Sequence, residues 1–262
     1  VQLPAVAKRV ALEERYSLEL ESLGDVAELV EVDGSSPDSF LAGARDADAL
    51  LTSWGIKIDQ QIIAGLEKCA VIGVGSVGVD MVDVDAATEA GIVVTNVPDV
   101  FIEEVADHTL MLLLACARRS KLMDKMVNEG KWYKGRPILE QIPRLWGQTL
   151  GLISFGNVAT AVARRAKPFG LNVIAYDPYV TELKMTAEGV QPVTLSELYE
   201  KSDYISIHPG LNDTSRAMLN DDAFAAMKNT VSIINCGRGP TIDEAALIRA
   251  LQSGQVAAAG LD

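Results

Sequence analysis

Residues 147–178 read GQTLGLISFGNVATAVARRAKPFGLNVIAYDP, and this stretch decides the fold that we predict. The apolar run 150–153 is typical of a buried parallel strand, residues 161–169 have the apolar spacing of a helix, and residues 172–176 are apolar again. Strand, tight turn, helix and strand together form a βαβ unit. Such a unit binds a dinucleotide when its first turn lets the backbone approach the pyrophosphate and a carboxylate ends its second strand.

The glycine fingerprint G-x-G-x-x-G is degraded in this turn. Ser154 stands at its first glycine and Ala159 at its third, so that only Gly156 remains. Ser154 is tolerated if its backbone needs no positive φ, and Ala159 still allows close packing of helix on strand. Asp177 follows at about 20 residues, where a ribose-binding carboxylate is expected. The alternative is an ordinary βαβ crossover with a solvated aspartate.

A second glycine-rich turn, GVGSVG at residues 73–78, fits the fingerprint better by spacing alone. The acidic residues that follow it, Asp80, Asp83 and Asp85, come too soon to bind the ribose, and the strand predicted at 92–96 ends in an asparagine. We therefore place the dinucleotide at the first motif. The amides of the second turn are expected to bind a carboxylate.

Composition limits the remaining possibilities. The 262 residues, 48% of them hydrophobic, suffice for two domains, and a formal net charge of −13 argues against binding to nucleic acid or to an anionic membrane. Cys69, Cys116 and Cys236 are scattered without C-x-x-C spacing, so we predict no disulfide framework, no metal site and a cytoplasmic location. The first fifteen residues hold no signal-peptide core, and the longest apolar run, 110–117, is too short to span a bilayer.

The first 95 or so residues alternate strands and helices as a doubly wound parallel sheet does. The strands are expected at 10–13, 27–32, 49–52, 70–73 and 92–96, and the helices at 36–45, 59–67 and 84–90. A long apolar helix at 103–119 then changes the character of the chain, and His108 is expected to be buried within it. This helix is followed by a second predicted helix at 122–129 and by the surface-prone WYKG at 132–135. Together they form an arm that a domain of this size does not need for its own core, which favours a homodimer contact.

The rest of the chain continues as a dinucleotide-binding sheet of six strands. After the βαβ unit, strands are expected at 192–193, 203–207, 230–235 and 256–261, and helices at 195–201, 221–227 and 243–252. The carboxyl ends of parallel strands form the ligand-binding edge of such a sheet. The fold class predicted is therefore α/β, with two doubly wound parallel-sheet domains, the second a Rossmann domain.

Four segments resemble the D-isomer-specific 2-hydroxyacid dehydrogenases, the family of phosphoglycerate, glycerate and formate dehydrogenases. They are GVDMVDVDAATEAGIVVTNVP at 78–98, VADHTLMLLLACAR at 105–118, the dinucleotide segment, and INCGRGPTIDEAAL at 234–247. The resemblance covers essentially the whole chain. Within the family, IEEVADHTL and HPGLNDTSRAMLND look most like the branch that holds the C-terminal-binding-protein corepressors and their bacterial relatives.

The resemblance implies an NAD-dependent dehydrogenase that transfers a hydride between the nicotinamide and a small D-2-hydroxy acid or 2-keto acid. Residues 1–98 would form a flavodoxin-like substrate-binding domain and residues 99–262 the NAD-binding domain. Arg238 would be catalytic, pairing with the substrate's carboxylate and keto oxygen, and the amides of Val77 and Gly78 would hold the carboxylate. An arginine suits this task because its guanidinium is a forked and permanently charged donor. The implied cofactor contacts are Gly156, Asn157, Val158, Asp177, His208, Thr214, Cys236, Gly237 and Asp262, with Thr109 as a further candidate.

In one respect the sequence departs from the family pattern. After the AGLD that ends in Asp262, relatives continue through a catalytic glutamate and a histidine that donates a proton to the keto oxygen. Reduction of a carbonyl needs a proton as well as a hydride. We therefore expect either part of a dehydrogenase or a pseudoenzyme that keeps its cofactor site. The competing function is that of an NAD(H)-sensing interaction protein of the corepressor kind.

Overall fold

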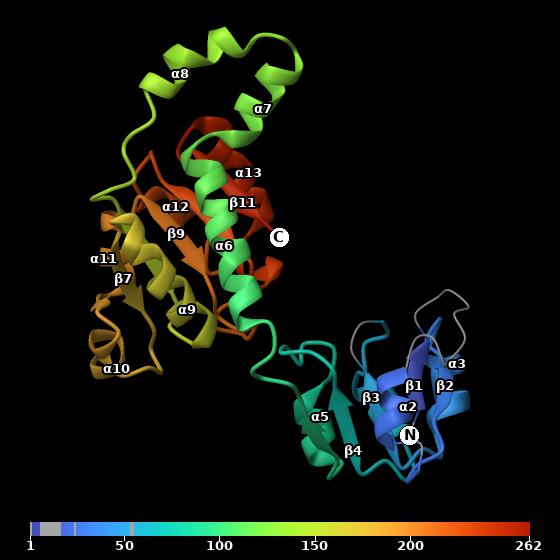
Figure 1. Ribbon diagram of the computed structural model, residues 1–262. Helices are drawn as coiled ribbons and strands as arrows, with labels where there is room; N and C mark the ends of the chain where they lie inside the picture. Colours follow the sequence, from blue (N-terminus) through green and yellow to red (C-terminus); the bar gives the residue numbers. More distant parts are fainter. Residues whose placement is uncertain (1, 6–16, 24, 53–54) are drawn as a thin grey trace. The chain divides into compact units, whose positions relative to one another are not determined.

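The computed structural model describes residues 2–5, 17–23, 25–52 and 55–262, which fall into two compact units, Val1–Val100 and Phe101–Asp262 (Figure 1). The domain boundary predicted from the sequence lies after residue 98. Each unit has its own parallel sheet and its own core, and the two are described separately.

The first unit contains a five-stranded parallel sheet with the order β2-β1-β3-β4-β5. Its strands are β1 (Gln2–Ala5), β2 (Val30–Asp33), β3 (Ala49–Thr52), β4 (Val71–Val74) and β5 (Val93–Thr95). This order is that of flavodoxin-like doubly wound sheets. Buried side chains from strands and helices, among them Phe40, Ile62 and Ile72, form its core. The predicted fold class is confirmed for this unit.

Among the described residues of this unit, four helices accompany the sheet: α2 (Ser17–Leu23), α3 (Pro37–Ala44), α4 (Gln60–Ala64) and α5 (Val84–Glu89). Three of them have an N-cap side chain that accepts a backbone hydrogen bond: Ser36 at α3, Asp59 at α4 and Asp83 at α5. Residues of these types are preferred N-caps, so the sequence itself indicates where these helices begin.

Two elements of this unit, β1 and α2, are not predicted from the sequence. In β1, Pro4 lacks an N–H and argues for an edge strand, whereas β1 lies between β2 and β3. The strand expected at 10–13 lies outside the described residues.

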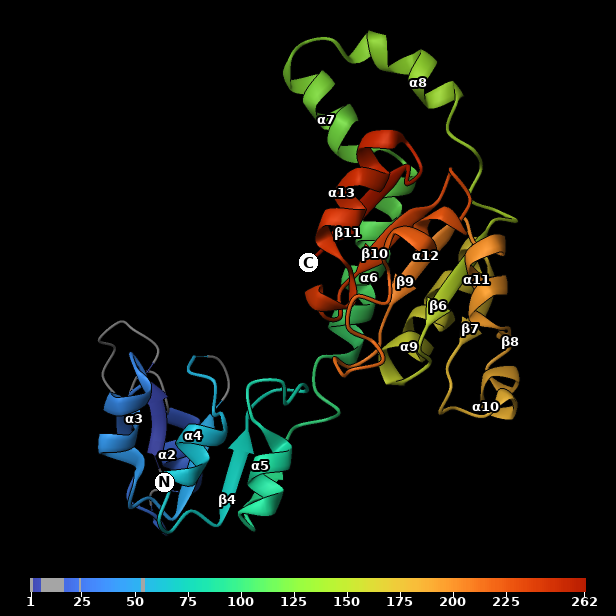
Figure 2. The ribbon, with the colours of Figure 1, turned by 180° about the vertical axis from the view of Figure 1, so that it is seen from behind.

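The second unit contains a six-stranded parallel sheet with the order β11-β10-β9-β6-β7-β8 (Figure 2). Its strands are β6 (Thr149–Ile153), β7 (Asn172–Tyr176), β8 (Gln191–Pro192), β9 (Tyr204–Ile207), β10 (Ser232–Asn235) and β11 (Ala258–Leu261). The chain order reverses between β6 and β9, which is the switch point at which Rossmann sheets bind their ligand. The predicted Rossmann fold is confirmed.

Helices cover both faces of this sheet. The α-helices are α6 (Ile102–Ala117), α7 (Ser120–Asn128), α8 (Arg136–Glu140), α9 (Asn157–Ala166), α10 (Glu182–Ala187), α11 (Leu195–Lys201), α12 (Asp221–Ala225) and α13 (Glu244–Ser253), and the 3₁₀ helices are η1 (Trp132–Gly135), η2 (Lys167–Phe169) and η3 (Gly239–Thr241). One buried cluster joins α6, α9 and α10 to the sheet, and a second joins α11, α12 and α13 to its other face. The helix expected at 161–169 begins earlier, at Asn157, directly after the turn that follows β6.

The apolar helix α6 packs along α9 and belongs to the core of the second unit. Leu110 and Leu113 are buried in this contact, and at its rim Arg165 donates to Glu103 and to Asp107. No helix among the described residues has the length and apolarity that crossing a bilayer requires.

The segment from α7 to α8 extends away from the sheet in both views (Figures 1 and 2). Neither helix has a buried residue. Trp132 is 70% exposed, and Tyr133 and Val127 are each 60% exposed. This arm therefore presents large apolar side chains to its surroundings.

Candidate functional site

The turn after β6 contains the start of the candidate site. Ser154 donates its N–H to the carbonyl oxygen of Tyr176 and has a φ of +69°, in the left-handed region that favours glycine. The condition under which the sequence analysis accepts a serine here, a backbone without positive φ, is therefore wrong. The backbone follows the path of the glycine fingerprint although the residue does not.

Gly156 precedes the first residue of α9 and leaves the space in front of this helix open. It has an ordinary φ of −82°, and a Cβ placed on it would meet no heavy atom within 4 Å. The N-terminus of a ten-residue helix, with its amides and its dipole, therefore faces a space that a side chain would otherwise fill. The pyrophosphate of a dinucleotide fits these donors. Asn157 is exposed and Val158 is half-buried at the start of the same helix.

Asp177 follows β7 beside this turn, and its carboxylate is held by four donors. Oδ2 accepts from Ser154 Oγ at 3.0 Å and from Phe155 N at 2.8 Å, and Oδ1 accepts from Tyr179 N at 2.8 Å and from Val180 N at 3.1 Å. Partial burial raises the pKa of Asp177, but the hydrogen bonds outweigh it and leave the pKa below its ordinary value. An ionised carboxylate thus stands where the adenosine ribose of a dinucleotide is expected.

His208 follows β9 at the next strand of this edge. Its backbone N–H donates to the carbonyl oxygen of Ile153, and its ring Nε2 lies 2.9 Å from Ser206 Oγ. The residue as a whole is half-buried, and burial of the imidazole lowers the pKa of His208 to about 4. The side chain is therefore neutral at neutral pH, which suits a residue that lines a ligand better than one that donates a proton.

The turn after β10 positions Arg238. The Asn235 side chain accepts from Gly237 N at 2.9 Å and donates to the carbonyl oxygen of Arg238 at 3.1 Å, and Thr241 Oγ1 donates to the same carbonyl at 2.6 Å. A Cβ on Gly237 would stand 3.1 Å from the carbonyl oxygen of Ile207, so this residue needs to be small. These contacts hold the half-buried Arg238 at the carboxyl edge of the sheet.

Asn235 is a positioning residue that the sequence analysis misses. The available signal is an asparagine that ends a strand directly before a Cys-Gly-Arg-Gly turn, where its amide can bond the backbone two and three residues on.

The last strand and helix α6 contribute a further group. His108 is exposed, with its Nε2 3.6 Å from Asp262 Oδ1, so the expectation that it is buried is wrong. It lies one helical turn before Leu112, on the flank of α6 that faces β11. Thr109, by contrast, is fully buried and donates its hydroxyl to the carbonyl oxygen of Val105 at 2.8 Å.

Two more predicted cofactor contacts lie on the same edge of the sheet. Cys236 follows β10, and burial raises the pKa of its thiol. Thr214 is exposed in the segment between β9 and α12, where its N–H and hydroxyl both donate to Asn212 Oδ1. None of the ten predicted cofactor contacts is tested by a bound ligand, and all stay predictions: Thr109, Gly156, Asn157, Val158, Asp177, His208, Thr214, Cys236, Gly237 and Asp262.

The glycine-rich turn of the first unit differs from the β6–α9 turn. Gly73 lies inside β4, and α5 begins only at Val84, capped by the carboxylate of Asp83, so no open helix N-terminus adjoins this turn. Asn96 Nδ2 donates to the carbonyl oxygen of Val77, and Ser76 Oγ donates to that of Gly78. The amides of Val77 and Gly78 have no hydrogen bond to a described residue, which leaves their role as carboxylate donors a prediction.

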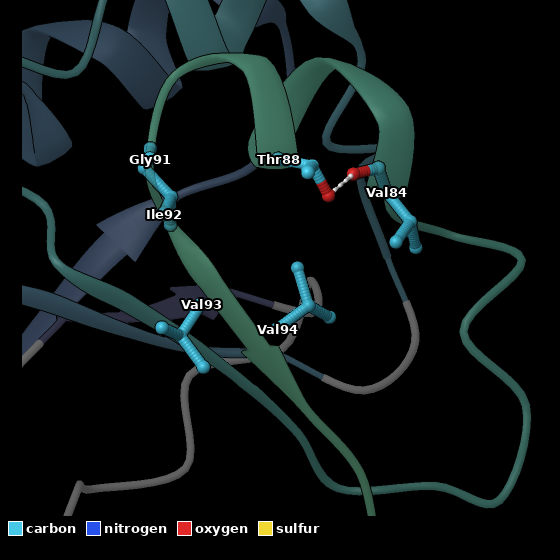
Figure 3. Close-up of a pocket in the computed structure, with 6 residues that line it drawn as sticks. All are labelled: Val84, Thr88, Gly91, Ile92, Val93 and Val94. Carbon is cyan, nitrogen blue, oxygen red and sulfur yellow. Dashed lines mark hydrogen bonds between the residues drawn. The ribbon is translucent and has the colours of Figure 1, made fainter.

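A hollow in the first unit lies beside α5 and β5 (Figure 3). It is lined by Val84, Thr88, Gly91, Ile92, Val93 and Val94, and the Thr88 hydroxyl in it donates to the carbonyl oxygen of Val84. With no charged group among these residues, the hollow offers no chemistry. Within the described ranges, no three His, Cys, Asp or Glu side chains are grouped to hold a metal ion.

Comparison with known proteins gives consistent matches. Residues 110–262 match the family model described as D-isomer specific 2-hydroxyacid dehydrogenase, NAD binding domain. The chain is 38% identical over 244 residues to a D-3-phosphoglycerate dehydrogenase of Methanocaldococcus jannaschii, covering 93% of this chain and 46% of that protein. It is also 38% identical over 219 residues to a glyoxylate reductase of Korarchaeum cryptofilum, covering 83% of this chain and 66% of that protein.

Among solved structures, the chain is similar to a D-lactate dehydrogenase from Aquifex aeolicus complexed with NAD and lactic acid. The TM-score is 0.89 at 28% identity, and the match covers 100% of this chain and 76% of that one. The chain spans about half the length of the phosphoglycerate dehydrogenases that it matches.

Proposed function

This chain belongs to the D-isomer specific 2-hydroxyacid dehydrogenase family, and on that premise we propose that it is an NAD-dependent oxidoreductase acting on a small D-2-hydroxy acid or 2-keto acid. The observation that carries the proposal is the pairing, at one edge of the six-stranded sheet, of an open helix N-terminus at Gly156 with an ionised carboxylate at Asp177. The relatives are named for phosphoglycerate, glyoxylate and lactate, which supports 2-hydroxy acids as the substrate class.

The residues of the second unit would hold the cofactor by its pyrophosphate and by its adenosine ribose. The first-turn amides of α9, at Asn157 and Val158, would bind the pyrophosphate, and Asp177 would accept hydrogen bonds from the adenosine ribose. Pro178 and Tyr179 follow Asp177 where an arginine could bind a 2′-phosphate, and the carboxylate repels such a phosphate. The site therefore favours NAD over NADP. The nicotinamide supplies or accepts the hydride when the cofactor is bound.

Arg238 would orient the substrate. A 2-keto acid is an anion whose carbonyl carbon must be held in line with the hydride donor, and a guanidinium can bond the carboxylate and the keto oxygen together. Its charge also stabilises the negative charge that develops on that oxygen during reduction. The amides of Val77 and Gly78 are proposed as further donors to the carboxylate.

Replacement of Arg238 tests this assignment. Arg238→Ala should leave the affinity for NADH nearly unchanged and lower the turnover of glyoxylate or hydroxypyruvate about 100-fold or more, because removal of one such donor costs about 3 kcal/mol of transition-state stabilisation. Arg238→Lys should restore little, since a single ammonium cannot replace the fork. Arg249→Ala is the matched control, because Arg249 is an exposed arginine of the same unit that bonds Asp221 on α12. Ordinary activity in Arg238→Ala would contradict the mechanism.

We also propose that the protein forms a homodimer through the arm of α7, η1 and α8. Val127, Trp132 and Tyr133 are large apolar side chains that remain mostly exposed on helices without a core of their own. A second copy of the arm would cover such a surface symmetrically.

The second candidate function is that of an NAD(H)-sensing interaction protein, as in the corepressor branch. The resemblance of IEEVADHTL and HPGLNDTSRAMLND to that branch is the observation that favours it. A protein of this kind would bind NADH and show no turnover of any 2-keto acid, so the Arg238 experiment separates the two candidates.

Cys69, Cys116 and Cys236 are free thiols, which supports a reducing compartment such as the cytoplasm.

A further inference from the structure

Ser154 occupies a backbone position that favours glycine. Its φ is +69°, and serine adopts this conformation at a cost in stability that glycine avoids. Neighbouring positions of the turn do not share this feature, since Phe155 and Gly156 are not in the left-handed region. Within this turn the unfavourable backbone conformation is therefore confined to Ser154.

The Ser154 hydroxyl donates to Asp177 Oδ2 at 3.0 Å, where Phe155 N also donates. Tyr179 N and Val180 N fill the same positions on Oδ1. A carboxylate offers about four lone-pair positions to donors. In this structure all of them are taken by the protein itself.

The four donors differ in how easily they can leave. Three are backbone amides, fixed by the β6–α9 turn and by the turn that follows β7. The fourth is a hydroxyl that can rotate away without any movement of the backbone. A ribose hydroxyl that approaches Asp177 would therefore take the position of Ser154 Oγ.

We propose that the Ser154 hydroxyl competes with the adenosine ribose for Asp177 and so sets the affinity for the cofactor. The inference rests on the proposed function, which has Asp177 accept the ribose hydroxyls. With ribose bound, the serine hydroxyl exchanges its carboxylate partner for water, and the binding free energy is reduced by the hydrogen bond that is given up. Ser154 is then a residue that weakens binding, in contrast to the glycine of the intact fingerprint.

The test is a fluorescence titration with NADH of Ser154→Ala and Ser154→Gly. Both variants should bind NADH about three- to tenfold more tightly than the unchanged protein, because a net hydrogen bond of ordinary strength is no longer lost. Ser154→Gly also relieves the backbone, so it folds even if Ser154→Ala is impaired. Thr186→Ala, which removes an exposed hydroxyl of α10, is the control and should leave the affinity unchanged.

Two further measurements separate competition from a change in the shape of the turn. Calorimetric titration with ADP should show the same gain, whereas its 2′,3′-dideoxy analogue, which cannot bond Asp177 through the ribose, should show none. In an Asp177→Asn background, Ser154→Ala should no longer change the affinity for NADH.

Unchanged or weaker NADH binding by both Ser154 variants would overturn the inference and identify the hydroxyl as a spectator or as a ligand contact. A gain of equal size with the dideoxy analogue would overturn it as well. If the unchanged protein and all variants bind neither NADH nor ADP, the cofactor site itself is wrong, and the proposed function fails together with the inference.

Discussion

Replacing Gly156 with alanine should separate the stability of the second unit from its affinity for the cofactor. The backbone there has φ −82° and ψ −163°, which alanine adopts without strain, and the new methyl group would enter open space. Alanine is a poorer N-cap than glycine, which lowers the free energy of unfolding, but it restricts the unfolded chain, which raises it. These effects of about 0.5–1 kcal/mol oppose each other. The free energy of unfolding should therefore change by less than about 1 kcal/mol.

Binding should suffer much more than stability. The methyl group would stand where the pyrophosphate must approach the amides of α9. Loss of one hydrogen bond to a charged oxygen costs about 1.5–3 kcal/mol, so NADH affinity should fall by a factor of about 10 to 150. Gly151→Ala in β6 is the contrasting variant, because its Cβ would stand 2.2 Å from Ser202 Oγ and 2.8 Å from Leu198 Cδ2. Such overpacking should cost about 1–3 kcal/mol or more of stability.

Urea unfolding gives the stability of each variant, and NADH fluorescence titration gives its affinity. Gly156→Ala should unfold at the same urea concentration as the unchanged protein and bind NADH weakly. Gly151→Ala should unfold at a lower urea concentration. Unchanged NADH affinity in Gly156→Ala would refute the placement of the pyrophosphate at α9.

Three further results are expected. His208 has a pKa of about 4 in the folded state and an ordinary pKa near 6.5 in the unfolded state. Between these pH values the unfolded state binds more protons. The contribution of His208 to the free energy of unfolding is therefore fully present above pH 6.5 and is lost, by up to about 3 kcal/mol, as the pH falls toward 4. Urea unfolding of His208→Gln should show a flatter profile in that window, and an identical profile would exclude His208 as its source. Val127→Glu in the exposed arm should give a monomer in sedimentation velocity, whereas Leu183→Glu, on exposed α10, should not, and a dimer in both variants would place the contact elsewhere. Asp177→Ala should narrow the difference between the affinities for NADH and NADPH; the assignment of the ribose site is wrong if the unchanged protein binds both equally.

The sequence predicts the second sheet well because its signals are local and repeated. Strand β7 and helix α11 have the predicted bounds, and the six strands follow in the order that a Rossmann domain requires. Short apolar runs ended by polar residues suffice for this, since buried parallel strands need apolar side chains on both faces.

What the sequence does not predict depends on tertiary contacts. The positive φ of Ser154 follows from the path between β6 and α9, and its hydroxyl bonds a carboxylate 23 residues away. The sequence predicts a buried His108 within an apolar helix. In the structure His108 lies on the flank of α6 that faces the end of β11, where it stays exposed beside Asp262, and this position depends on how α6 packs against the sheet. Local pattern alone does not contain either relation.

Hydrogen exchange with and without ADP distinguishes the two glycine-rich turns, residues 73–78 and the turn between β6 and α9, as alternative binding sites for the dinucleotide. ADP carries the pyrophosphate and the ribose that the site is proposed to hold. We expect slower exchange for the amides of residues 155–160, 177, 179 and 180, which surround the open N-terminus of α9 and Asp177, and unchanged exchange for residues 73–78. Protection of residues 73–78 with no change at 155–160 would contradict it and assign the nucleotide to the turn that matches the fingerprint by spacing alone.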